Sequence, residues 1–456
     1  PISKACWGNY ISVSQITSRE KGFITREGKT NVAKVKIDGK EIVLPVLVQP
    51  GQAAGTVGIA LGFGRTKAGK VATEAGGVSM YPFLKMDGTV RNTQIANVEL
   101  ASADEMVKFA QTQTHQTFMG RESIIQETTL VEYQKDDLAG RYLPKISTSK
   151  GLVSPQDISM WDVSSDSYPK EKPAPKTDYE KNLWSSRNGD DSDIHKYPIH
   201  HWGMVIDLNT CTGCSACVVA CHTENNVPIV GKQEIINRRE MHWLRIDRYY
   251  SSEGAPKDYA ALEIASDSPE VIFQPLMCQH CNNAPCETVC PVAATTHSTE
   301  GLNQMTYNRC VGTKYCANNC PYKVRRFNWF KYFNNDEFDY HLNNDLGKMV
   351  LNPDVTVRSR GVMEKCSLCV QRIQSGKLKA KSEKRTVNDG DVMTACASAC
   401  PSDAITFGDL NNMESSISKL LNHEIKSRAY NILDEVGTKP NVWYLTKVRN
   451  KDQEKA

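Results

Sequence analysis

The sequence lacks a hydrophobic run that could cross a membrane, and it lacks a strong charge of either sign. No stretch approaches the roughly 18 uninterrupted apolar residues of a membrane-spanning helix, and 55 basic residues nearly balance 52 acidic ones, for a net charge of +3. Because nucleic acids are usually bound by a basic surface, this balance predicts no nucleic-acid partner. The chain begins at Pro1 rather than at a methionine, so we expect a processed protein or part of a longer one, with any export signal upstream.

Recognisable catalytic groups are also missing. No Ser-His-Asp arrangement and no acid–base pair of carboxylates can be argued from the sequence. The glycine-rich stretch at 58–69 lacks the Gly-Lys-Ser/Thr ending of a phosphate-binding loop. Cysteines are scarce outside one region, since 15 of the 16 lie between Cys211 and Cys400 and only Cys6 stands apart. We expect Cys6 to be a buried small hydrophobic residue.

Residues 1–125 predict a β-rich domain. Apolar and β-branched residues at 32–37 and 42–48 flank Asp38-Gly39. A two-residue Asp-Gly step between such runs is a strong hairpin signal. We therefore expect at least one antiparallel strand pair in this part of the chain.

Two further segments differ in composition from the rest. Residues 126–200 are predicted to form an extended linker or arm that Trp161 and Trp184 could anchor, because the composition shifts from about residue 145 and the stretch 164–182 is rich in Pro, Ser, Lys and Asp. From 411 to 456, the apolar residues predict a tail of one or two short helices that could serve as a docking element. The apolar positions of that tail are Leu420, Leu421, Ile425, Ile432 and Leu433.

Four cysteine motifs fill the region between these segments. They are Cys211-x2-Cys214-x2-Cys217-x3-Cys221; Cys278-x2-Cys281-x4-Cys286-x3-Cys290-Pro291; Cys310-x5-Cys316-x3-Cys320-Pro321; and Cys366-x2-Cys369-x26-Cys396-x3-Cys400-Pro401. A loop with a cysteine at every third residue can point three sulfurs at one cubane cluster, while a fourth cysteine three residues on ligates a second cluster. The spacing therefore predicts iron–sulfur clusters. A zinc-stabilised interaction scaffold is the alternative, because paired Cys-x2-Cys units also form zinc ribbons.

The motifs resemble those of the four-cluster ferredoxin-type subunits of the molybdopterin oxidoreductase superfamily. The resemblance covers residues 201–410 and implies an α+β fold with two pseudo-symmetric βαββαβ ferredoxin modules. It pairs the first motif with the fourth and the second with the third. The ligand sets that it implies are Cys211, Cys214, Cys217 and Cys400 for one [4Fe-4S] cluster; Cys221, Cys366, Cys369 and Cys396 for a second; Cys278, Cys281, Cys286 and Cys320 for a third; and Cys290, Cys310 and Cys316 for a [3Fe-4S] cluster.

The three-cysteine set follows from one departure within the third motif. In "CVGTKYCANNCP", Thr313 stands where Cys214 stands in "CTGC" of the first motif. A threonine hydroxyl forms no anion easily at neutral pH and is a poor substitute for a thiolate. We therefore predict that Thr313 marks the vacant corner of a [3Fe-4S] cluster. In the related subunits such a cluster lies nearest the membrane.

A finer resemblance concerns the whole chain. Residues 1–125 resemble the C-terminal β-barrel domain of molybdopterin-binding subunits, and its fusion to the ferredoxin part resembles the iron–sulfur (B) subunit of bacterial alternative complex III. This implies a non-catalytic electron-transfer subunit, without molybdopterin in this portion, that relays electrons from quinol through three [4Fe-4S] clusters and one [3Fe-4S] cluster to c-type haems. The implied partners are a quinol-binding integral membrane subunit and a multihaem cytochrome c, on the periplasmic face of the inner membrane. The alternative is the electron-transfer part of a catalytic molybdopterin oxidoreductase.

Five charged or titratable residues lie beside the motifs. Lys323, Arg325 and Arg326 follow the third motif, and they could hydrogen-bond near a cluster, face a membrane partner or simply form a solvated basic surface. His222 and His280 neighbour ligand cysteines. Since thiols fill the other ligand positions, we predict that neither histidine is a ligand.

Overall fold

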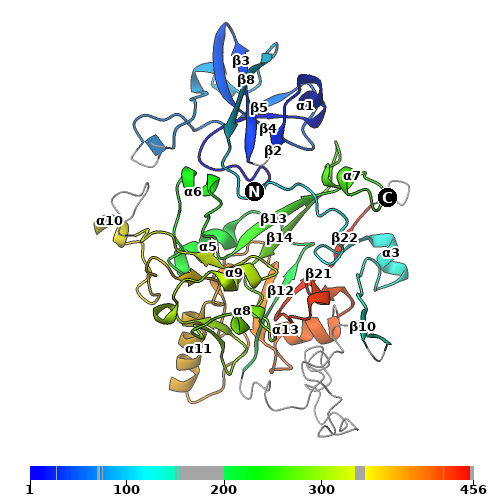
Figure 1. Ribbon diagram of the computed structural model, residues 1–456, viewed down its shortest axis with the longest axis vertical. Helices are drawn as coiled ribbons and strands as arrows, with labels where there is room; N and C mark the ends of the chain where they lie inside the picture. The colour runs from blue at the N-terminus through cyan, green and yellow to red at the C-terminus, as the bar shows by residue number, and fades with distance from the viewer. Residues whose placement is uncertain are drawn as a thin grey trace.

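The computed structural model is an α+β protein in which a small N-terminal sheet lies against a larger cysteine-rich region (Figure 1). The description covers residues 1–451 except 27, 69–71, 74, 149–150, 154–199, 334–344 and 425. Most of the predicted linker, with Trp161 and Trp184, lies outside the described residues, as does Ile425 of the tail. Within the described ranges, no helix is long and apolar enough to span a membrane.

The N-terminal sheet is open rather than closed into a barrel. Its strands are β1 (Ile11–Val13), β2 (Thr25–Arg26), β3 (Lys29–Ile37), β4 (Lys40–Val48), β5 (Val57–Ile59) and β8 (Glu99–Lys108). They follow the order β2-β3-β4-β1-β5, and β8 pairs with β3. Among the described residues no pairing joins β5 to β8. The chain between them includes the 3-10 turn η1 (Tyr81–Phe83) and the separate hairpin of β6 (Lys85–Asp87) and β7 (Val90–Asn92). The expected barrel-like closure is therefore not confirmed.

The hairpin predicted around Asp38-Gly39 is confirmed. Strands β3 and β4 pair antiparallel with Ile37 opposite Lys40. Asp38 and Gly39 both have positive φ, at 49° and 79°, as a two-residue type I′ turn requires. Val35 of β3 and other apolar side chains of this sheet are buried together in one core. Helix α1 (Gln15–Lys21), capped by Ser14, follows β1 in the chain.

A four-stranded sheet holds the two ends of the cysteine-rich region together. Its order is β19-β12-β21-β20, with bounds β12 (Trp202–Asp207), β19 (Ile405–Asp409), β20 (Ala429–Tyr430) and β21 (Val442–Leu445). Strand β12 leads into the first motif and β19 leaves the last one, and the two strands pair antiparallel. Two paired strands therefore bound the cysteine motifs at their entry and exit.

Short helices and strands between β12 and β19 carry the motifs. They are α5 (Ala216–Glu224), α6 (Lys232–Ile236), β13 (Arg245–Tyr250), α7 (Tyr259–Glu263), β14 (Val271–Leu276), α8 (Pro285–Thr288), β15 (Thr295–His297), β16 (Asn303–Met305), η5 (Tyr307–Arg309), α9 (Tyr315–Asn319), β17 (Arg326–Phe327), α10 (Asp345–Lys348), β18 (Met363–Glu364), α11 (Val370–Ser382) and α12 (Ala395–Ser398). Around the second and third motifs the order β14-α8-β15-β16-α9-β17 follows the βαββαβ pattern. Helix α5 packs against α12, and α8 against α9. Each helix pair thus joins the two motifs that the resemblance pairs.

The C-terminal segment is not a purely helical tail. After α13 (Ser416–Lys419) and a π-helical turn at Leu420–Glu424 come η7 (Lys426–Arg428), β20, η8 (Asp434–Val436), β21 and β22 (Lys447–Arg449). Strand β21 runs parallel to β12, and Val442, Trp443 and Tyr444 are fully buried. A helical spacing rule missed these strands, because each spans at most four residues and is stabilised by a distant partner.

The start of the predicted linker also differs from the expectation. Strand β9 (Glu127–Thr129) pairs in parallel with β22, and Glu127 forms an ion pair of 2.7 Å with Arg449. Helix α3 (Leu130–Lys135) follows, with a capping box between Thr129 and Glu132. Farther on, β10 (Ile146–Thr148) and β11 (Gly151–Val153) form a hairpin. The described part of this segment therefore contains regular structure that its composition did not predict.

We predict that Trp443→Ala destabilises the cysteine-rich region, because this side chain is fully buried beside β12. Truncating a buried tryptophan should lower the free energy of unfolding by about 3–5 kcal/mol. Thermal or denaturant unfolding of the purified protein measures the loss. The control is Tyr259→Ala, since Tyr259 is 64% exposed and its truncation leaves no cavity; equal effects of the two substitutions would contradict the placement of β21.

Candidate iron–sulfur site

The four Cys-x2-Cys or Cys-x2-Thr loops share one backbone feature. In each of them the third residue has a positive φ: 70° at Gly213, 44° at His280, 71° at Gly312 and 53° at Leu368. Such left-handed residues turn the chain sharply, and they favour glycine. Two of the loops also need glycine for space, because a Cβ would lie 2.5 Å from the Phe273 ring at Gly213 and 2.2 Å from a backbone oxygen at Gly312.

Thr313 occupies the loop position that Cys214 has in the first motif. In both loops the preceding glycine is left-handed (φ 71° and 70°), and so is the following residue (φ 61° and 68°). A helix then begins two residues after Thr313 and two residues after Cys214. Both side chains are exposed. The third motif therefore keeps the loop geometry and differs from the first in the side chain.

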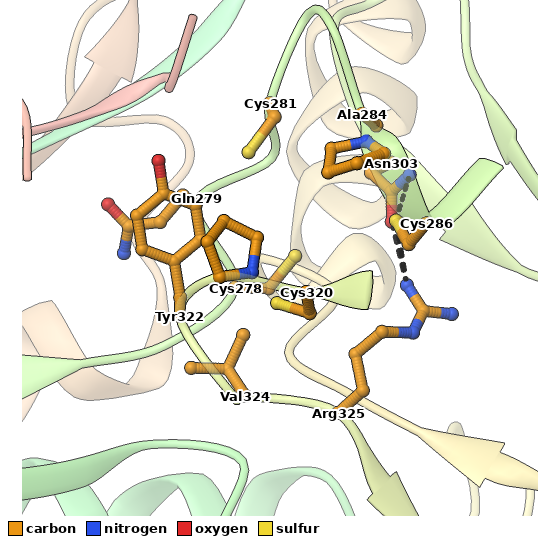
Figure 2. Close-up of a pocket in the computed structure, with 12 residues that line it drawn as sticks. Cys278, Gln279, Cys281, Ala284, Cys286, Asn303, Cys320, Tyr322, Val324 and Arg325 are labelled. Carbon is orange, nitrogen blue, oxygen red and sulfur yellow. Dashed lines mark hydrogen bonds between the residues drawn. The ribbon is translucent and has the colours of Figure 1, made fainter. Parts of the chain in front are cut away.

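One set of predicted ligands surrounds a single cavity. Cys278, Cys281, Cys286 and Cys320 all line it, and all four are buried. Figure 2 shows the four side chains distributed around this space. The first three come from the loop before and within α8, and Cys320 follows α9. The packing of α8 against α9 thus brings the second and third motifs together.

A second cavity is lined by the three-cysteine set. Cys290, Cys310 and Cys316 line it, and Thr313 lines it as well. Thr295 and Met305, from the hairpin of β15 and β16, complete one wall. The structure thus brings together the three predicted ligands and the threonine at the predicted vacant corner.

The other two sets converge between α5 and α12. The Cys217 thiol lies within electrostatic reach of Cys211, Cys214 and Cys400. One turn farther along α5, the Cys221 thiol lies near the remaining thiols of its predicted set, Cys366, Cys369 and Cys396. The thiols of these two predicted sets therefore lie near one another, and the assignment of each thiol to one cluster stays a prediction.

Neighbouring sets adjoin one another. Cys217 of the first set interacts with Cys396 of the second, and Cys366 of the second interacts with Cys278 of the third. The third set and the three-cysteine set share a neighbour, because Arg325 interacts with Cys286 and Cys316. The four sets therefore form a continuous series through the region.

Comparison with known proteins supports iron–sulfur clusters in this region. The family of 4Fe-4S dicluster domains matches residues 210–294 and again residues 269–336. The chain is 40% identical over 251 residues to the iron–sulfur cluster-binding subunit of menaquinone reductase from Nitratidesulfovibrio vulgaris, a match that covers 54% of this chain and 89% of that subunit. The chain belongs to the family of ferredoxin-type iron–sulfur subunits with 4Fe-4S dicluster domains.

Other members of this iron–sulfur subunit family come from different complexes. Hdr-like menaquinol oxidoreductase iron–sulfur subunit 1 of Archaeoglobus fulgidus is 30% identical over 260 residues, which are 53% of this chain and 82% of that protein. The B subunit of selenate reductase from Mesobacillus selenatarsenatis is 30% identical over 257 residues, which are 54% of this chain and 72% of that protein. These matches each span about half of this iron–sulfur subunit.

The donor sets of this iron–sulfur subunit consist of thiols, which are the protein ligands that iron–sulfur clusters take. Burial raises the pKa of Cys217 and of Cys286 to about 12, and that of Cys396 to about 11. These thiols are therefore protonated at neutral pH when no metal is bound, and iron must displace their protons.

Hydrogen bonds to the thiols come from residues that sequence reasoning missed. The amide N–H groups of Ala294 and Ala404 donate to Cys290 Sγ at 3.1 Å and to Cys400 Sγ at 3.3 Å, in both cases just after a Cys-Pro step. Asn225 Nδ2 lies 3.6 Å from Cys221 Sγ and 3.8 Å from Cys369 Sγ. Donors of this kind stabilise thiolate charge. Asn225 could have been found from the sequence, because it lies one helical turn after Cys221.

The five residues predicted beside the motifs have different surroundings. Lys323 is exposed, whereas Arg326 forms an ion pair of 2.9 Å with Glu240. Arg325 is buried and donates to Cys286 Sγ at 3.3 Å, so a solvated basic surface is wrong for this residue (Figure 2).

The remaining candidates lie outside the four thiol sets. His222 pairs with the His242 ring at 2.8 Å, and burial lowers the pKa of His222 to about 3. His280 is fully buried, and its Nδ1 accepts the amide N–H of Asn303. Cys6 is half-buried against the core of the region. His222 therefore contacts another histidine, whereas His280 contacts Asn303, which lines the first cavity.

We predict that Gly312→Ala disrupts the cavity of the three-cysteine set. The added Cβ would meet the Gly361 carbonyl oxygen at 2.2 Å, in addition to a left-handed backbone cost of about 1–2 kcal/mol. Iron analysis of the purified protein should show a loss of about one cluster per chain. Gly390→Ala is the control, because Gly390 also has a positive φ (87°) but open space around it. Unchanged iron content in Gly312→Ala would contradict this account.

Proposed function

We propose that this iron–sulfur subunit relays electrons from quinol to c-type haems in a respiratory complex of the alternative complex III type. The observation that carries the proposal is the position of Thr313, in place of a fourth thiol, in the cavity at one end of the series of thiol sets. The names of two relatives, a menaquinone reductase subunit and a menaquinol oxidoreductase subunit, support a quinone-linked role.

In this proposal the four sets hold three [4Fe-4S] clusters and one [3Fe-4S] cluster. Bound clusters supply one-electron transfer between fixed centres. The residues of this chain hold the centres next to one another, exclude water with buried side chains and donate hydrogen bonds to the thiolates. Electrons would enter at the set of Cys290, Cys310 and Cys316 and leave at the set that contains Cys400. The chain itself carries out no substrate chemistry.

The proposed surroundings follow from the same assignment. A quinol-binding integral membrane subunit would face the end of the series that contains Thr313, and a multihaem cytochrome c would take the electrons. The complex would lie on the periplasmic face of the bacterial inner membrane. The N-terminal sheet would correspond to the barrel-like C-terminal domain of a molybdopterin-binding subunit, without a pterin in this portion.

A second candidate is supported by the name of another relative. The selenate reductase relative is named for a reductase of a small oxyanion. This chain would then be the electron-transfer part of a catalytic molybdopterin oxidoreductase, with the pterin on another portion. Elemental analysis of the intact complex separates the candidates, because stoichiometric molybdenum or tungsten supports the second one and contradicts the first.

We predict that Thr313→Cys recruits a fourth iron and slows quinol oxidation. The new thiol stands at the loop position of Cys214, so it can complete a cubane ligand set. Electron paramagnetic resonance of the oxidised complex should lose its three-iron signal, and iron should rise by about one atom per chain. Thr313→Ser keeps a hydroxyl and is expected to retain the signal. A wild-type protein with four cubanes and no oxidised three-iron signal would rule out the proposed cluster composition.

A further inference from the structure

Arg325 is a buried cation between two of the thiol sets. Only 6% of the residue is exposed. Its Nη1 donates to Cys286 Sγ at 3.3 Å and to Asn303 Oδ1 at 3.3 Å, and Figure 2 shows the guanidinium pointing at this edge of the first cavity. The side chain therefore contacts a predicted cluster ligand directly.

The other amino group of the same guanidinium contacts residues that line the second cavity. Nη2 donates to Thr295 Oγ1 at 2.7 Å and lies 3.2 Å from Met305 Sδ, and both residues line the cavity of the three-cysteine set. The guanidinium charge also interacts electrostatically with the Cys316 thiol. One charge thus lies beside ligands of two neighbouring sets.

Among the described residues no carboxylate forms an ion pair with Arg325. The nearby carboxylate of Glu287 interacts with His297 at 2.6 Å instead. Arg358, by contrast, has a counter-ion, because its guanidinium forms an ion pair of 2.9 Å with the equally buried Glu364. A buried charge without a counter-ion is strongly unfavourable. The anions within reach of Arg325 are the thiolates of the two cavities when iron is bound.

We propose that Arg325 is a shared tuning residue that raises the reduction potentials of the clusters in both cavities. This inference rests on the proposed electron relay. Reduction adds one electron to a centre, breaks no bond and leaves the guanidinium protonated. A fixed positive charge in a buried site stabilises the more negative, reduced state. Because both centres feel the same charge, their potentials rise together and the step between them stays small.

The experiment is a redox titration of the intact complex, followed by electron paramagnetic resonance. Arg325→Met removes the charge and keeps an unbranched, apolar side chain. We expect the midpoints of both centres to fall, with at least a tenfold change in the equilibrium constant of reduction, equal to about 59 mV for a one-electron couple. Arg325→Lys keeps the charge and should restore most of the shift.

The matched control is Lys323→Met, which removes an equal charge two residues away. Lys323 is exposed and donates to the Asn318 carbonyl, so water screens its charge. Its substitution should leave both midpoints unchanged.

Three outcomes would overturn the inference: unchanged midpoints in Arg325→Met, a shift in only one centre, or an equal shift in Lys323→Met. If Arg325→Met loses its clusters, the comparison moves to Arg325→Lys and Arg325→Gln, and equal midpoints for these two variants also overturn it. The proposed relay has a separate test: it is wrong if quinol reduces none of the clusters in the wild-type complex.

Discussion

The convergence of distant thiols around shared cavities is the constraint on which the cysteine-rich region depends. Cys217 and Cys400 must meet although 182 residues separate them in the sequence. The antiparallel pairing of β12 with β19 and the packing of α5 against α12 bring them together. The corresponding packing of α8 against α9 does the same for the second and third motifs. The sheet and the helix pairs are therefore arranged around the thiol sets.

Charge is the second constraint, and it links the fold to electron transfer. Buried thiols are neutral without metal, but iron-bound thiolates bring negative charge into a region of low polarity. The region places buried cations there, namely Arg325 and Lys365, which are 6% and 2% exposed. Lys365 donates to the carbonyl oxygen of Cys366 at 2.9 Å, beside the second set. These buried positive charges are therefore better compensated when the thiolates bind iron than when iron is absent.

Much of the site could be predicted from the sequence, because ligand spacing is a local property. The four cysteine motifs could be read from a few neighbouring positions each, and the pairing of motifs came from the family resemblance. The β3–β4 hairpin was equally local, since Asp38-Gly39 determines its turn.

The rest depends on contacts between distant residues. Strand β21 is stabilised by β12, more than 200 residues earlier, and β9 by β22, more than 300 residues later. The open edge of the N-terminal sheet likewise depends on the path of the connection after β5. Charge pattern also could not distinguish Arg325 from Lys323, because burial decides which of the two contacts a thiol.

The most direct test of the central claim is anomalous diffraction from crystals of the loaded protein at the iron edge. The account predicts four iron peaks in one series, each inside a thiol set, with the weakest at Cys290, Cys310 and Cys316 and no iron adjacent to Thr313. Single zinc ions in the same cavities, fewer than four peaks, or an iron atom bound beside Thr313 would contradict it.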